Sequence, residues 1–130
     1  MTTHTATCRC GQLTAICTGD PVRVSVCHCF DCQKRSGSAF AAQVRFPAEA
    51  VTITGASREY LTTNDQGVTR FHFCGACGTT PFYRHDHAPE TIAIALGAFD
   101  DPHAFTPNFS VWESRKHDWV AISGDSVEHD

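Results

Sequence analysis

The sequence lacks a long hydrophobic run, an excess of basic residues and any long segment with helical periodicity. No apolar stretch approaches the length of a membrane span, so we expect no membrane partner. The formal net charge of −4 disfavours nucleic acid as a partner, and with it a zinc ribbon that binds DNA, because such proteins need a basic face. The first residues, MTTHTATCRCGQ, have neither the basic nor the apolar region of a secretory signal, so we expect a cytoplasmic protein.

Cysteine is abundant, with eight in 130 residues. Reducing conditions in the cytoplasm argue against disulfides. The pairs Cys8/Cys10 and Cys27/Cys29 are also spaced too closely to look like disulfide bridges. Metal binding explains this pattern better. The globular composition and the length predict a single domain over residues 1–130.

Short alternating segments broken by Gly, Pro, Asp and Asn predict a mainly β fold with antiparallel sheets and small zinc-binding turns. We expect strands over residues 12–18, 22–26, 39–46, 51–54, 58–61, 69–73, 91–96 and 109–112. Residues 64–67 predict a hairpin turn, and residues 30–37 a short helix that ends at Gly37. Residues 123–130 predict a frayed acidic tail.

Two further segments allow a functional and a purely structural interpretation. The aromatic residues of segment 97–120 are expected in the core, with a pocket wall as the alternative; they are Trp112, Trp119, Phe105 and Phe109. Residues 85–87 (His-Asp-His) precede Ala-Pro, so we expect a solvated loop there and not a third metal site.

Four cysteines from two distant segments predict a closed metal site. "TCRCG" (7–11) offers Cys8 and Cys10, and "FCGACG" (73–78) offers Cys74 and Cys77. A C-x-x-C turn followed by glycine suits a zinc knuckle, and a C-x-C pair in extended chain places both side chains on one face. A tetrahedral zinc needs sulfurs on the order of 4 Å apart, which both pairs can meet.

A second site involves Cys27, Cys29 and Cys32, with Cys17 as the open question. Cys17 lies in a predicted strand and is expected to pack as a small hydrophobic residue. The alternative is that it closes a second four-cysteine site, which leaves no open metal position. His28 has the opposite parity to its cysteine neighbours, so it points away from the metal, as a core or surface histidine or as a residue beside the pocket.

With three thiolates, zinc keeps an open position, where it can stabilise the thiolate of a bound thiol or polarise a carbonyl. An electron-rich three-thiolate site favours thiolate delivery, so thiol-plus-aldehyde chemistry fits it. The following segment offers weak candidates for contacts with the thiol substrate, namely Lys34, Arg35, Ser36 and Ser38. A capped helix end with favourably placed cations is the compatible alternative.

Five segments together resemble the glutathione-dependent formaldehyde-activating enzyme (GFA) family. They are "TCRCG", "VCHCFDCQKRSGSAF", "FCGACGTTPF", "ALGAFDDP" and "WESRKHDWV", and the resemblance covers about residues 7–122. It implies a β-tent-like fold, a structural zinc on Cys8, Cys10, Cys74 and Cys77, and a catalytic, labile zinc on Cys27, Cys29 and Cys32. Cys17 is no part of the motif.

The resemblance implies a carbon–sulfur lyase-type enzyme similar to S-hydroxymethylglutathione synthase. Its expected partners are a small thiol such as glutathione and a small aldehyde such as formaldehyde. The competing hypothesis is a zinc-stabilised binding module without catalysis, in which Cys17 closes the second site.

Overall fold

The structure is a computed structural model that describes residues 1–130 as two β-sheets and one short α-helix. The small sheet has the order β1 (Thr3–Thr7), β2 (Thr14–Thr18), β5 (Val51–Thr54). The large sheet has the order β11 (Glu128–His129), β10 (Phe109–Val111), β3 (Arg23–Cys27), β4 (Ala41–Pro47), β9 (Thr91–Ala95), β8 (Phe82–His85), β7 (Gly67–Phe73), β6 (Arg58–Asn64). The helix α1 spans Phe30–Ser36, and the 3-10 turns are η1 (Ala48–Ala50), η2 (Leu96–Ala98), η3 (Pro102–Ala104) and η4 (Glu113–Arg115).

The expected mainly β fold with antiparallel sheets is confirmed, and each predicted strand overlaps an observed one. Two pairings are parallel, because β10 lies between β3 and β11 and runs in the same direction as both. Three strands were not predicted, namely β1, β8 and β11. They are short or poor in large apolar residues, so they carry little alternation to recognise.

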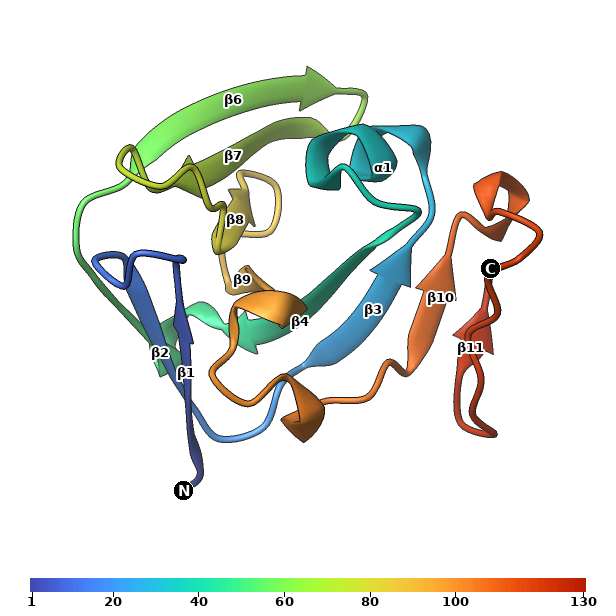
Figure 1. The fold of residues 1–130 in the computed structure, drawn as a ribbon, viewed down its shortest axis with the longest axis horizontal. Coiled ribbons are helices and arrows are strands. Elements are labelled where there is room, and N and C mark those ends of the chain that lie inside the picture. The colour runs from blue at the N-terminus through green and yellow to red at the C-terminus, as the bar shows by residue number, and fades with distance from the viewer.

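The large sheet curls around the molecule, and the small sheet lies against part of one face of it (Figure 1). The hydrophobic core fills the space between them. From the large sheet it takes alternate residues of β4 and β9, which are Val44, Phe46, Ile92 and Ile94. The small sheet contributes alternate residues of β2 and the segment before it, which are Leu13, Ala15 and Cys17. Burying each large aliphatic or aromatic side chain stabilises the fold by about 1.5–3 kcal/mol.

The two predicted local elements are found. Asn64 pairs with Gly67 across a two-residue turn between β6 and β7. The Asn64 side chain accepts from the Gln66 backbone N–H at 2.8 Å. The helix ends at Gly37, which has a φ of 69° and donates its backbone N–H to the carbonyl of Gln33.

The prediction of a frayed tail is wrong. β11 pairs with β10, and the Asp130 backbone N–H donates to the carbonyl of Ser110 at 2.9 Å. The His129 ring also donates to the Glu113 carboxylate at 2.6 Å. These contacts hold a segment whose composition alone predicts disorder.

Two aromatic residues also differ from expectation. Trp112 and Trp119 are 56% and 76% exposed, so the core prediction is wrong for both. Phe105 does pack against the core. In segment 85–87, His85 ends β8 and its ring hydrogen-bonds to Thr69, whereas Asp86 and His87 are exposed as expected.

None of the helices combines the length and the apolar character that crossing a membrane requires.

Candidate metal centres

The first cysteine cluster joins two segments that are distant in sequence. Cys8 and Cys10 follow β1, while Cys74 and Cys77 follow β7. Their four sulfur atoms all lie within 4.8 Å of one another. The Cys8–Cys10 and Cys10–Cys74 sulfur separations are 3.6 and 3.7 Å. Tetrahedral zinc with Zn–S bonds of about 2.3 Å requires sulfurs about 3.8 Å apart, so this donor set fits zinc.

Hydrogen-bond donors surround the sulfurs of this cluster. The Leu13 backbone N–H donates to the Cys8 sulfur at 3.3 Å. The Gln12 amide donates to the Cys74 sulfur at 3.0 Å. It also donates to the Ala56 carbonyl and accepts from the Ala56 backbone N–H. Hydrogen bonds from the side chain and backbone of Thr79 lower the pKa of the Cys77 thiol to about 5. Stabilised thiolates are the form that binds metal.

The cluster lies at the edge of the fold's interior, with Cys10 exposed and Cys77 half-buried. Cys8 and Cys74 are buried members of the hydrophobic core. A metal bound to all four sulfurs would connect the small sheet to the end of β7. This placement suits a closed, structural site.

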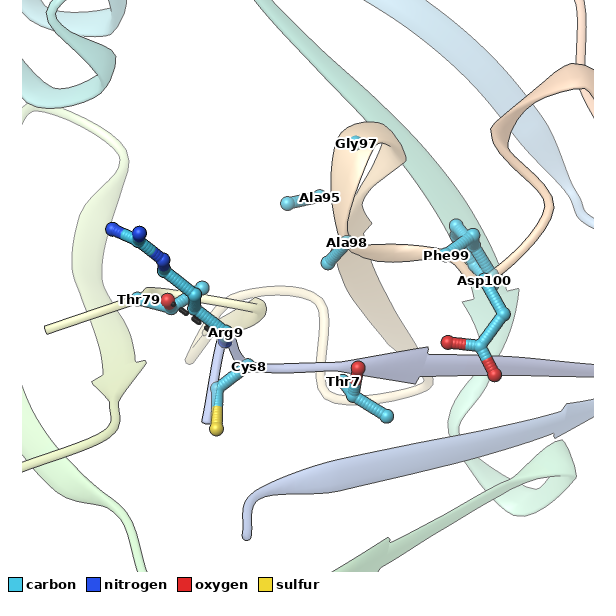
Figure 2. Close-up of a pocket in the computed structure, with 9 residues that line it drawn as sticks. All are labelled: Thr7, Cys8, Arg9, Thr79, Ala95, Gly97, Ala98, Phe99 and Asp100. Atoms are coloured by element: carbon cyan, nitrogen blue, oxygen red, sulfur yellow. Dashed lines mark hydrogen bonds between the residues drawn. The ribbon is translucent and has the colours of Figure 1, made fainter. Parts of the chain in front are cut away.

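A surface hollow of about 530 Å³ lies beside this cluster, between the end of β1 and η2 (Figure 2). Its lining combines small residues such as Ala95 and Ala98 with polar residues such as Thr7 and Asp100. The Arg9 backbone N–H donates to the Thr79 hydroxyl at 3.1 Å at one side of it. Figure 2 shows the Cys8 sulfur pointing away from Ala98, so the hollow does not open onto that sulfur.

The second cluster comes from one short segment. Cys27 is the last residue of β3, Cys29 caps the N-terminus of α1, and Cys32 lies in the first turn. Their three sulfur atoms lie within 4.8 Å of one another. The Cys29 sulfur accepts from the Cys32 backbone N–H at 3.3 Å. Cys27 is buried and Cys29 and Cys32 are half-buried, so the cluster is partly exposed to solvent.

The thiols of this cluster differ in acidity. A hydrogen bond from Cys32 lowers the pKa of Cys27, and the same contact together with burial raises the pKa of Cys32. Burial also raises the pKa of Cys29. The sulfurs therefore lie close enough for each thiol to influence the acidity of the others.

Cys17 is not part of this cluster. It lies in β2, fully buried in the hydrophobic core, and burial raises the pKa of its thiol to about 11. The cluster's sulfur atoms come from Cys27, Cys29 and Cys32 alone. The alternative in which Cys17 closes the second site is therefore wrong, because the strand directs Cys17 into the core between the sheets.

His28 lies behind the cluster. It is fully buried, and its Nε2 hydrogen-bonds to the Ser110 hydroxyl at 2.9 Å. Burial lowers the pKa of its ring. Gln33 strengthens the same junction, because its amide donates to the carbonyls of His28 and Arg115. These contacts fix the segment of the three cysteines against β10 and η4.

The weak candidates for substrate contacts are all exposed and surround the C-terminal end of α1. The Ser36 hydroxyl donates to the Cys32 carbonyl at 2.7 Å and accepts from the Ser38 backbone N–H, so it caps the helix. Lys34 lies in the last turn with Arg35. The Arg35 guanidinium lies over the ring of Phe71 at 4.9 Å, which directs it toward the large sheet.

Sequence reasoning missed two residues near this cluster, Arg45 in β4 and Tyr83 in β8. Arg45 lies 3.5 Å from the Tyr83 hydroxyl. The Arg35 guanidinium lies 5.3 Å from the centre of the Tyr83 ring. The strand order that brings β8 toward α1 has no local signal in the sequence.

The fold resembles a solved structure. A crystal structure of a Rhodobacter sphaeroides protein, a Northeast Structural Genomics target, matches with a TM-score of 0.60 and 18% sequence identity. The match covers 77% of this chain and 93% of the other. At this identity the likeness concerns the fold alone. No curated protein matches the chain.

A family model described as "Glutathione-dependent formaldehyde-activating enzyme" matches residues 3–115. The matched region contains both cysteine clusters, the helix α1 and the strands from β1 to β10. The resemblance seen in the cysteine motifs is confirmed, and the chain belongs to the GFA family.

Proposed function

We propose that this chain is a zinc-dependent enzyme of the carbon–sulfur lyase type, which adds a small thiol to an aldehyde or catalyses the reverse reaction. The observation that carries the proposal is the three-cysteine cluster, in which Cys27 is buried and Cys29 and Cys32 are half-buried, and which excludes the fourth candidate, Cys17. The family description supports glutathione as the thiol and formaldehyde as the aldehyde.

Both clusters fit zinc by donor type and spacing. In the proposal Cys8, Cys10, Cys74 and Cys77 hold a structural zinc, and Cys27, Cys29 and Cys32 hold a labile one. Zinc at the second site would supply stabilisation of a thiolate and polarisation of a carbonyl. In the reaction, the substrate sulfur forms a bond to the carbonyl carbon, and the thiol proton ends on the carbonyl oxygen.

The residues of the chain position the reactants. The Cys29 cap and the Gln33 contacts hold the three sulfurs at the start of α1. The proposed substrate contacts remain Lys34, Arg35, Ser36 and Ser38. Among them Arg35 has the strongest support, because its guanidinium lies over Phe71 and Tyr83 and is held near the cluster.

The proposal extends to the organisation and location of the protein. We propose one domain over residues 1–130 and a cytoplasmic location, where thiols stay reduced and can bind metal.

The test measures formation of S-hydroxymethylglutathione from glutathione and formaldehyde by exchange NMR, with zinc-loaded protein and with buffer alone. We expect the exchange rate to rise with protein concentration. Cys29→Ser should abolish the increase and bind one zinc fewer, while Cys17→Ala should retain both activity and zinc. A zinc-loaded wild type that leaves the exchange rate at the buffer value would refute catalysis of this reaction.

A further inference from the structure

The face of the large sheet that turns away from the core carries polar side chains beside the three-cysteine cluster. On β3, Cys27 shares this face with Ser25 and Arg23, because alternate residues of a strand point the same way. Arg23 pairs with Arg45 of β4, so Arg45 shares the face of Cys27. One face of β3 and β4 therefore connects the cluster to Arg45 through the buried side chains of Ser25 and Gln43.

Four strands form a row across this face at the level of Arg45. Arg45 pairs with Ala93, Ala93 with Tyr83, and Tyr83 with Phe71. The small side chain of Ala93 lets Arg45 approach the Tyr83 hydroxyl to 3.5 Å. From the opposite direction, Arg35 of α1 lies over the rings of Phe71 and Tyr83. Figure 1 shows α1 near the end of β3 and beside the β6–β7 hairpin, consistent with this reach.

Two guanidinium groups thus converge on one phenol, and neither is paired with a carboxylate. The ion pairs of the structure lie elsewhere; they are Arg70–Glu59, Arg70–Asp86, His72–Glu59 and His129–Glu113. Arg45 is half-buried, and charges in such positions normally have a partner.

Between the cluster and Arg45, this face carries a buried polar pair. Gln43 is 3% exposed, and its amide nitrogen donates to the Ser25 hydroxyl at 3.0 Å. Its Oε1 is buried and has no partner within the protein. Gln43 shares the face of Arg45, two residues along β4, and its register lies between those of Cys27 and Arg45. A carboxylate has no hydrogen-bond donor for this covered oxygen, so Gln43 takes no direct part in the carboxylate site.

We propose that Arg45, Arg35 and the Tyr83 hydroxyl bind a carboxylate of the thiol substrate, so that the enzyme prefers thiols that carry an acid group. Guanidinium groups bind carboxylates through paired, charge-assisted hydrogen bonds, and a phenol adds a third donor. The inference rests on the proposed function, because it takes the three-cysteine cluster as the place where the thiol sulfur binds.

The test compares glutathione with glutathione diethyl ester, whose carboxylates are blocked, by isothermal titration of the zinc-loaded protein. Wild type should bind glutathione at least about 10-fold more tightly, the low end for hydrogen bonds to a charged group. Arg45→Gln should remove most of this preference and leave the affinity for the ester within about twofold. Tyr83→Phe keeps the ring and should reduce the preference by a smaller factor.

Arg84→Gln is the matched control. Arg84 follows Tyr83 in β8, so it points to the other face of the sheet, where its guanidinium lies near Phe82. This substitution removes the same charge at almost the same place in the fold, and the variant's preference for the acid should equal that of wild type. Thermal unfolding of every variant checks that the protein is folded.

The outcomes separate the two proposals. If wild type binds the acid and the ester equally but still accelerates adduct formation, the carboxylate site is refuted and the proposed function stands. The carboxylate site is also refuted if Arg84→Gln reduces the preference as much as Arg45→Gln. If a charged aldehyde such as glyoxylate, and not the thiol, loses affinity in Arg45→Gln, the assignment to the thiol is wrong. If wild type binds no thiol and accelerates nothing, both proposals fail.

Discussion

Replacing Cys17 tests the separation of core packing from metal binding. Cys17 is fully buried in β2, beside Leu13 and Ala15 in the core. Cys17→Ala removes one buried sulfur atom, and its effect should resemble the loss of a buried methylene group, about 1 kcal/mol. For a chain of this length, 1 kcal/mol lowers the unfolding temperature by about 4 °C. Both zinc ions should remain.

Cys17→Ser sharpens the prediction. Serine has nearly the size of cysteine, but its hydroxyl would enter an apolar environment. An unpartnered hydroxyl in a protein interior costs about 1–3 kcal/mol. Serine should therefore destabilise the protein at least as much as alanine does. A metal ligand would behave differently, because either substitution would remove one zinc.

The assay combines zinc content per chain with thermal unfolding at a fixed zinc concentration. Cys29→Ser and Cys8→Ser serve as reference variants, and each should lose one zinc. If Cys17→Ala also binds one zinc fewer than wild type, Cys17 is a ligand and the three-cysteine interpretation is refuted. If neither Cys17 variant changes the unfolding temperature, the packing estimate is wrong.

Three further predictions address how the clusters and the tail are held. Gly55→Ala should destabilise the protein by about 2 kcal/mol or more, seen in thermal unfolding, because Gly55 has a φ of 102° and a Cβ there would overlap the Gln12 carbonyl. Glu113→Gln should lower the unfolding temperature at pH 7, and the difference from wild type should shrink below about pH 4.3, the ordinary pKa of glutamate. Hydrogen bonding to Ser110 and His129 lowers the pKa of Glu113, so its stabilisation is present at higher pH and is lost as this carboxyl protonates. Deleting residues 128–130 should speed hydrogen exchange at Ser110 while zinc content stays unchanged; equal exchange would show that β11 contributes nothing.

Local sequence patterns predicted the cysteines of both clusters correctly. They did not predict the contact between Arg45 and Tyr83, which depends on the pairing of distant strands. The second cluster lies within the six residues from Cys27 to Cys32, so the short spacing of its cysteines alone brings the sulfurs together. Arg45 and Tyr83 meet only because β9 lies between their strands, which depends on the strand order of the whole sheet. No periodicity in either segment encodes that order.

The C-terminal segment and the tryptophans show that composition alone does not predict local order or burial. Composition predicts disorder for residues 123–130, yet the open edge of β10 binds β11 through backbone hydrogen bonds that are independent of side-chain type. Aromatic content predicts burial for Trp112, yet this residue adopts a φ of 59° at the start of η4 and its side chain is exposed. Neither the left-handed backbone nor the exposure of Trp112 is visible in composition.

The two clusters differ in how far apart their cysteines lie in the chain. A metal at each cluster would therefore contribute differently to the stability of the fold. Cys10 and Cys74 are 64 residues apart, and a cross-link of that span removes about 4 kcal/mol of chain entropy from the unfolded state. The sulfurs of Cys27, Cys29 and Cys32 come from one short segment, so a metal there constrains little chain that β3 and α1 do not already order. In the proposed function, a metal at the first cluster would hold the sheets together, and a metal at the second would be exchanged without unfolding. An active site that must accept a substrate thiol benefits from that independence, because its ligands can rearrange while the fold depends on other contacts.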